Sequence, residues 1–170
     1  MRSAAALALL LALCPAVAVA QAAATERATS DRDLGWVAFG LGLGAPYEAA
    51  AAVTANLGRA RVLQFGYHCN TEFRLGGNPG SVNALHVGAG LSRASQSGRV
   101  ALAAGPAVVW GSRHEGLLEE SFTAAGVVLS GQFMLTPHPT FGLGLDAFVI
   151  VNAVESARGL ALTLVIEGHK

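Results

Sequence analysis

Strict alternation between bulky apolar residues and small or polar residues is the feature that most constrains the fold of this chain. In the stretch FGLGLDAFV, which begins at Phe141, Leu143 and Leu145 alternate with Gly144 and Asp146. A period of two residues indicates a β-strand, because successive side chains of a strand point to opposite faces. The two faces of this strand must therefore meet different surroundings.

The same alternation recurs in eight segments separated by turn signals. We predict strands at about 35–44, 48–57, 62–73, 83–92, 99–111, 122–135, 141–149 and 159–168. Their number is even, and most are long enough to cross a bilayer as tilted strands, which takes roughly 9–11 residues. The pattern predicts an all-β fold, a single eight-stranded antiparallel up-and-down transmembrane β-barrel over residues 34–168.

Three positions fit the pattern less well. The alanine-rich segment 48–57 is also compatible with a helix. Phe122 falls on the small and polar face of its segment, so we expect a β-bulge near the start of that strand to restore the phase. Pro106 lacks the N–H that a paired strand needs and should disturb the fifth strand.

Composition indicates which face meets water. Charged residues make up only 13% of the chain, against about 25% in ordinary soluble proteins. The less apolar faces carry Gly, Ala, Ser, Thr, Asn, Gln and His, which suit the narrow interior of an eight-stranded barrel. We predict that they line a crowded polar interior around the large side chains of Trp36 and Phe148, with the apolar faces turned to lipid. A soluble secreted barrel with the faces reversed and an apolar ligand inside is the alternative.

The N-terminal residues resemble an export signal. Residues 1–20 combine Arg2, an apolar run and a final Ala-Val-Ala, which predicts a cleaved signal peptide; residues 21–33 form a polar linker. A lipoprotein acylated at Cys14, or a structural N-terminal helix, is the alternative. Without the signal peptide, ten basic and eleven acidic residues give a formal charge of −1, which argues against nucleic acid as a partner. Cys69 then has no cysteine partner for a disulfide.

Two histidines, His68 and His86, point inward on adjacent predicted strands. Paired imidazoles could bind a metal or transfer protons, but no third ligand is evident, and a structural hydrogen-bond network is the other interpretation. Asp146 and Glu167, meeting Arg99, should form a charge network, because buried charges must be paired. The candidate interior polar network comprises Gln64, His68, His86, Arg99, Gln132, Asp146 and Glu167.

These alternating segments, with short turns and a preceding signal peptide, resemble the small outer-membrane β-barrels of the OmpA/OmpX type over about residues 34–168. The resemblance implies a place in the bacterial outer membrane, contact with outer-membrane lipids, and insertion by the outer-membrane assembly machinery. We expect a monomer without cofactor or metal.

Some barrels of this size are enzymes that modify envelope lipids, and such an enzyme is the other alternative for this chain. The lipid A deacylases carry a His-x-Ser pair, which is absent here, and the His, Asp and Ser of palmitoyltransferase barrels find no match. We therefore predict a non-enzymatic protein with a structural or accessory role in the envelope, and at most a very narrow pore.

Overall fold

Each alternating segment forms a β-strand. The computed structural model describes residues 33–73, 79–95, 97–115, 118–135 and 140–169, so the predicted signal peptide (1–20) and nearly all of the linker (21–33) lie outside the described residues. The strands are β1 (Asp33–Ala45), β2 (Ala49–Leu57), β3 (Arg61–Thr71), β4 (Ser81–Ala94), β5 (Gly98–Glu115), β6 (Leu118–Leu135), β7 (Phe141–Asn152) and β8 (Ala157–His169).

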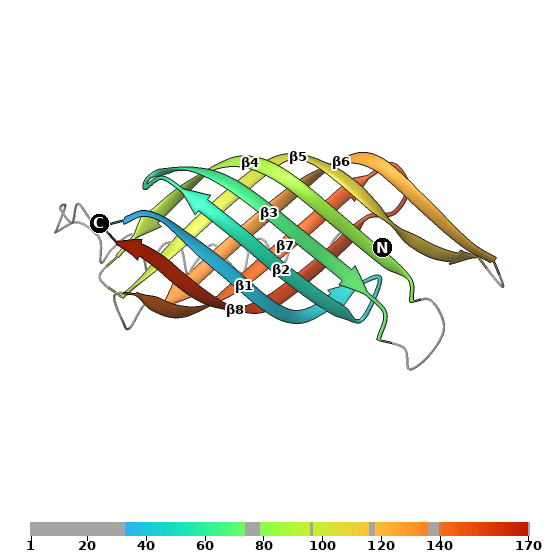
Figure 1. Ribbon diagram of the computed structural model, residues 1–170, viewed down its shortest axis with the longest axis horizontal. Helices are drawn as coiled ribbons and strands as arrows, with labels where there is room; N and C mark the ends of the chain where they lie inside the picture. The colour runs from blue at the N-terminus through green and yellow to red at the C-terminus, as the bar shows by residue number, and fades with distance from the viewer. Residues whose placement is uncertain (1–32, 74–78, 96, 116–117, 136–139, 170) are drawn as a thin grey trace, which may run out of the picture. The chain divides into compact units, whose positions relative to one another are not determined.

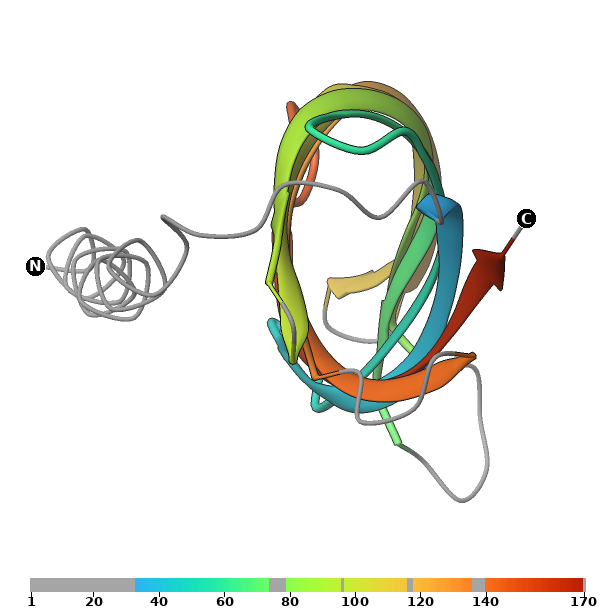
Figure 2. The ribbon, with the colours of Figure 1, turned by 90° about the vertical axis from the view of Figure 1, so that its left-hand side faces the viewer.

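Each of the eight described strands pairs antiparallel with its neighbours in the chain, and β8 returns to pair with β1, which closes the barrel (Figures 1 and 2). The predicted eight-stranded up-and-down barrel is confirmed. The alanine-rich segment is strand β2, because it pairs along its whole length with both β1 and β3. No helix in the described part of the chain is long and apolar enough to cross a membrane.

The bulge expected near Phe122 is wrong. Strand β6 keeps one register against β5 from Leu118 to Leu135, so Phe122 stays on the inward set. It is half-buried and packs against the interior side chains at that end of the barrel. Gly111 lies opposite Phe122 on β5, and a Cβ there would lie 3.1 Å from Cζ of the phenylalanine, so the glycine leaves space for the ring. This pairing is not predictable from one segment of the sequence.

Pro106 interrupts one ladder without shifting it. Pairing between β4 and β5 is continuous except at Val87 and Gly88, opposite Pro106 and Gly105, and resumes in the same register. The proline has no N–H to donate, so the backbone pairing between β4 and β5 is interrupted at this position. Its pairing with β6 is intact.

The two faces of each strand separate as the sequence predicts. In β7 the side chain of Leu143 is 57% exposed and that of Asp146 is 1% exposed. Trp36 and Phe148 are both buried inside the barrel, as expected. The bulky apolar residues therefore lie on the outer surface and the small or polar residues lie inside.

The interior is less polar than predicted, because two of its three layers consist of apolar side chains. Four connections lie at one end of the barrel, called here the loop end: β1–β2, β3–β4, β5–β6 and β7–β8. The other connections lie at the opposite end, called here the turn end, together with the start of β1 and the end of β8. An apolar layer fills the loop half: Tyr47, Ala50, Ala52, Val82, Ala84, Ala107, Val109, Val128, Phe148, Ile150, Ala157 and Ala161. A second apolar layer fills the turn half: Trp36, Ala38, Val62, Ala101, Met134 and Val165. Polar side chains form a central layer between them.

Candidate functional site

Buried side chains of the central layer form a hydrogen-bonded chain across the barrel. Trp36 on β1 donates its indole N–H to Gln132 Oε1 on β6 at 3.0 Å. The amide Nε2 of Gln132 donates to Asp146 Oδ2 on β7 and to Thr54 Oγ1 on β2, both at 2.7 Å. Gln132 therefore joins strands that are far apart in the sequence and uses both of its amide hydrogens.

The chain continues along β2 to β3. Asn56 Nδ2 donates to Thr54 Oγ1 at 3.2 Å, and Gln64 Nε2 donates to Asn56 Oδ1 at 2.9 Å. Ser130 Oγ donates to Gln64 Oε1 at 2.7 Å, and His86 Nε2 lies 3.0 Å from the same oxygen. Because that amide oxygen only accepts, the hydrogen of His86 must be on Nε2.

The two predicted inward histidines lie together. The imidazoles of His68 and His86 stack with their centroids 5.1 Å apart, and His68 also lies 4.4 Å from the ring of Phe148. His68 Nε2 is 3.4 Å from Asp146 Oδ1, which is an ion-pair distance without hydrogen-bond geometry. The ring atom Nδ1 of each histidine has no hydrogen-bond partner.

The two histidines do not form a metal site with other described side chains. Within the described part of the chain, no group of three or more His, Cys, Asp or Glu side chains could hold a metal ion. His68 and His86 stack face to face instead of converging on a common point. The geometry favours aromatic packing and hydrogen bonding over metal ligation.

The predicted charge network divides into two parts. Glu167 lies opposite Trp36 at the turn end, whereas Asp146 lies opposite Ala161 in the central part of the barrel. Arg99 approaches Glu167 with 3.7 Å between Nε and Oε1, and its guanidinium lies 4.4 Å from the centre of the Trp36 ring. Glu167 therefore pairs with Arg99, while Asp146 pairs with Gln132 and His68.

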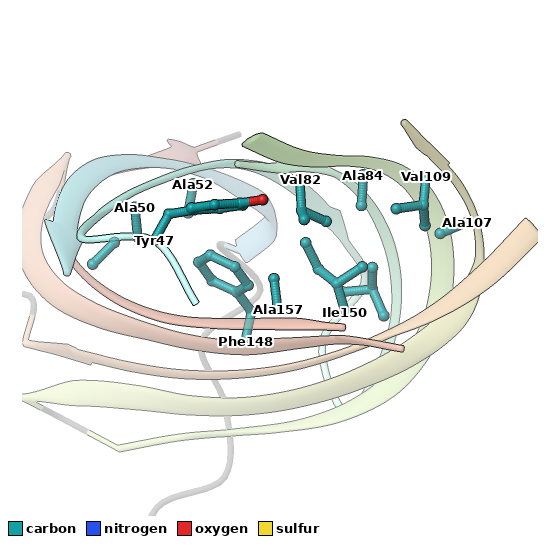
Figure 3. Packing of buried hydrophobic residues seen from close by; sticks show 12 residues of the cluster. Tyr47, Ala50, Ala52, Val82, Ala84, Ala107, Val109, Phe148, Ile150 and Ala157 are labelled. Atoms are coloured by element: carbon teal, nitrogen blue, oxygen red, sulfur yellow. The ribbon is translucent and has the colours of Figure 1, made fainter. Parts of the chain in front are cut away.

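The loop end is closed by a residue that sequence reasoning missed. Tyr47, in the connection between β1 and β2, turns its ring into the barrel above Phe148 (Figure 3). Its single hydroxyl hydrogen is shared between two acceptors, the carbonyl oxygen of Ser112 at 3.2 Å and Glu155 Oε1 at 3.1 Å. Its backbone N–H donates to Asn70 Oδ1 at 2.9 Å. Tyr47 thereby joins the β1–β2 and β7–β8 connections to the ends of β3 and β5 at the loop end.

Burial raises the pKa of Tyr47 to about 12, and the charge of Glu155 acts in the same direction. The phenol therefore stays protonated, and it donates a hydrogen at any pH that the protein meets in a cell. No local sequence signal marks this residue, because its partners lie far away in the chain and the turn pattern GAPYE is compatible with an exposed tyrosine.

The outer surface is the second candidate site. Bulky apolar side chains from all eight described strands cover it without an outward charge in the middle of the strands. Near the loop end the ring of Trp110 lies 6.1 Å from that of Tyr67, whose hydroxyl donates to Asn83 at 2.7 Å. Phe133 and Phe141 are exposed toward the turn end. Aromatic residues at both edges of an apolar band are typical of transmembrane barrels.

Known proteins share the fold of this chain but not its sequence. No family model and no curated protein sequence matches. The N-terminal β-barrel domain of OprF from Pseudomonas aeruginosa superposes with a TM-score of 0.60 at 8% identity, over 81% of this chain and 99% of that one. Neisserial surface protein A gives 0.58 at 12% identity, over 83% and 100%. Ail, the attachment invasion locus protein of Yersinia pestis, gives 0.56 at 9% identity, over 78% and 96%. The chain therefore has the fold of the small eight-stranded outer-membrane barrels.

Proposed function

We propose that this protein is an outer-membrane β-barrel that spans the bilayer and has a structural or accessory role in the envelope. The observation that carries the proposal is the continuous apolar outer band. Its exposed members include Phe39, Leu41, Leu63, Phe65, Leu85, Leu91, Leu102, Val108, Leu129, Phe133, Leu143, Leu145, Leu160, Leu162 and Ile166. A water-exposed surface of this extent would drive aggregation, whereas lipid solvates it.

The two ends differ in a way that supports an orientation. The connections at the turn end, 58–60, 95–97 and 136–140, are short, whereas at the loop end the β3–β4 connection is longer and the β5–β6 hairpin has the longest strands. Outer-membrane barrels have short periplasmic turns and longer outer loops. We therefore place the turn end in the periplasm, which agrees with export directed by residues 1–20 and with insertion by the assembly machinery.

The filled interior supports a non-conducting role. Apolar side chains occupy both halves of the barrel, and the central layer between them is hydrogen-bonded from wall to wall. Tyr47 closes the loop half, and the Arg99–Trp36 contact occupies the turn half. An eight-stranded barrel has only enough interior space for its own side chains. A narrow pore and an internal apolar ligand are both less compatible with this packing.

An enzyme acting on envelope lipids is the other candidate from the sequence. Such chemistry needs a histidine and a nucleophile at a rim, where lipid can reach them. The two histidine side chains that the structure describes, His68 and His86, are buried in the central layer instead. The burial of these two imidazoles supports a non-enzymatic barrel, and we propose that it is a monomer.

Membrane fractionation combined with gel electrophoresis tests the proposal. The protein should remain in the outer-membrane fraction, and its mobility in SDS should differ between boiled and unboiled samples, because a closed barrel resists SDS until it is heated. A soluble periplasmic protein whose mobility is the same in both samples would overturn the proposal. It would favour the reversed-face barrel.

A further inference from the structure

Three exposed arginines gather at one place on the rim of the turn end. Arg59 lies in the β2–β3 connection, Arg61 begins β3, and Arg93 lies near the end of β4. Ser92 fixes the connection to β4, because its N–H donates to the carbonyl of Ala60 at 2.9 Å and its hydroxyl donates to the carbonyl of Arg59. The backbone that carries Arg59 and Arg61 is thereby held against the stretch of β4 that carries Arg93.

The backbone of the turn itself requires glycine. Gly58 has φ 110°, in a region that residues with a Cβ rarely adopt, and a Cβ there would overlap the carbonyl of Arg61. The turn that presents the arginines therefore has a defined conformation.

The arginines continue the lipid-facing columns of the barrel. Arg61 stands two residues before Leu63 on the outward face of β3 and lies opposite Leu91, and Arg93 follows Leu91 on the outward face of β4. The guanidinium groups lie where the apolar band ends. In a bilayer, this is the level of the phosphate groups of the adjacent leaflet.

The two ends of the barrel differ in charge. Among the side chains that the structure describes, the outward charged groups at the turn end are these three arginines, and the carboxylate of Glu167 at that end faces inward toward Arg99. The loop end instead combines acidic and basic side chains: Glu48, Glu72, Arg113, Glu120, Glu155 and Arg158. Among the described side chains, the outward charge at the turn end is therefore positive.

We propose that Arg59, Arg61 and Arg93 form a binding site for the phosphate headgroup of an anionic phospholipid in the leaflet at the turn end. A guanidinium presents paired N–H groups that match two oxygens of a phosphate, and several near one another favour an anionic lipid over a zwitterionic one. The acyl chains of that lipid lie along the columns that contain Leu63 and Leu91. This inference rests on the proposed membrane insertion.

Lipid retention by the full chain tests the site. The wild type, Arg61→Gln/Arg93→Gln and the loop-end control Arg158→Gln are reconstituted in vesicles of equal parts phosphatidylglycerol and phosphatidylcholine. Each is then extracted in mild detergent, and bound lipid is measured by native mass spectrometry. The wild type and Arg158→Gln should retain phosphatidylglycerol in preference to phosphatidylcholine. The double variant should lose about tenfold or more of this preference, since each arginine near a membrane surface contributes roughly 1 kcal/mol.

The same samples separate the two proposals. A heat-dependent SDS mobility shift reports insertion of each variant, and its absence in the wild type would overturn the membrane proposal and this site with it. If the wild type and both variants insert and retain equal amounts of phosphatidylglycerol, the site alone is overturned. Displacement of the bound lipid by soluble glycerol phosphate would show a free-phosphate site instead. If the double variant fails to insert, Arg61→Gln and Arg93→Gln alone should each show a partial loss, and no loss in either would overturn the site.

Discussion

Gln132 and Asp146 face each other directly across the β6–β7 ladder, and the amide of Gln132 donates a 2.7 Å hydrogen bond to the carboxylate of Asp146. The other carboxylate oxygen lies 3.4 Å from His68 Nε2. With Asp146 1% exposed, this carboxylate has no access to water outside the barrel. Its neighbours must supply what water would otherwise provide.

Removal of the Asp146 side chain should destabilise the barrel. In Asp146→Ala an amide hydrogen of Gln132 loses its partner, which costs about 1–3 kcal/mol of unfolding free energy. Asp146→Asn keeps an acceptor for Gln132 and should cost less. Denaturant unfolding from detergent micelles, followed by tryptophan fluorescence, measures both variants. Equal stability of the alanine variant and the wild type would contradict the network.

The stability that Tyr47 contributes at the loop end should decrease at high pH. Its pKa is about 12 in the folded barrel against 10 for a free phenol. Below pH 10 the phenol is protonated in both the folded and the unfolded chain, so its contribution to the unfolding free energy is constant. Between pH 10 and 12 it ionises in the unfolded chain but not in the folded barrel, so the unfolding free energy decreases as pH rises. Tyr47→Phe should lack this component of the alkaline transition. At neutral pH it should be about 1 kcal/mol less stable, because the two hydroxyl contacts are lost.

Absorbance at 295 nm, where tyrosinate absorbs, checks the assignment. Subtraction of the Tyr47→Phe titration from that of the wild type isolates one phenol, and its midpoint should lie near pH 12. A midpoint near pH 10 would mean that Tyr47 points into water. The buried hydrogen bonds to Ser112 and Glu155 would then be absent.

Gly66 makes room for an imidazole. A Cβ at this position would overlap the ring of His86, which lies on the facing strand. We expect Gly66→Ala to lower the unfolding free energy by about 1–3 kcal/mol through overpacking. Gly131→Ala is the control, because its Cβ would lie 3.1 Å from the flexible end of Leu102 and no nearer than 4.0 Å to the backbone oxygen of Ala147, and it should be close to neutral. A destabilisation of similar size in both variants would indicate a general effect of glycine replacement.

A charged side chain on the outer band should lower the unfolding free energy, and the loss should increase with the depth of the charge in the bilayer. Leu145 lies near the middle of β7 and is exposed. Leu145→Arg should cost about 2–4 kcal/mol in a bilayer, the range for an arginine at the midplane of a transmembrane barrel. Val154→Arg, in the β7–β8 connection, should cost little. Unfolding from vesicles measures the difference, and equal costs at both positions would mean that Leu145 is not in lipid.

The sequence pattern predicts the barrel because strand alternation is local. Residues such as Leu143 and Asp146 are assigned to opposite faces by parity alone, and one consistent choice of faces orients every strand. Phe122 shows where parity is insufficient. The pattern predicts a bulge to turn this phenylalanine outward, whereas the ring stays inward, opposite Gly111, and packs against the interior side chains.

Contacts within the interior depend on tertiary pairing and are not predictable from one segment. Trp36 and Gln132 are 96 residues apart, and Tyr47 and Glu155 are 108 apart. The sequence identifies Asp146 and Glu167 as buried carboxylates but cannot assign their partners, since these depend on the height of each residue along the barrel axis. The closed register supplies that information.

Accessibility of spin labels in vesicles tests the central claim most directly. Nitroxides at positions 143, 145 and 149 of β7, introduced in a cysteine-free background, should collide freely with oxygen and rarely with a polar nickel chelate, because lipid dissolves the first and excludes the second. A label at position 154 should show the reverse. Nickel access at the three strand positions, or shielding of them from both reagents, would contradict a lipid-facing outer band.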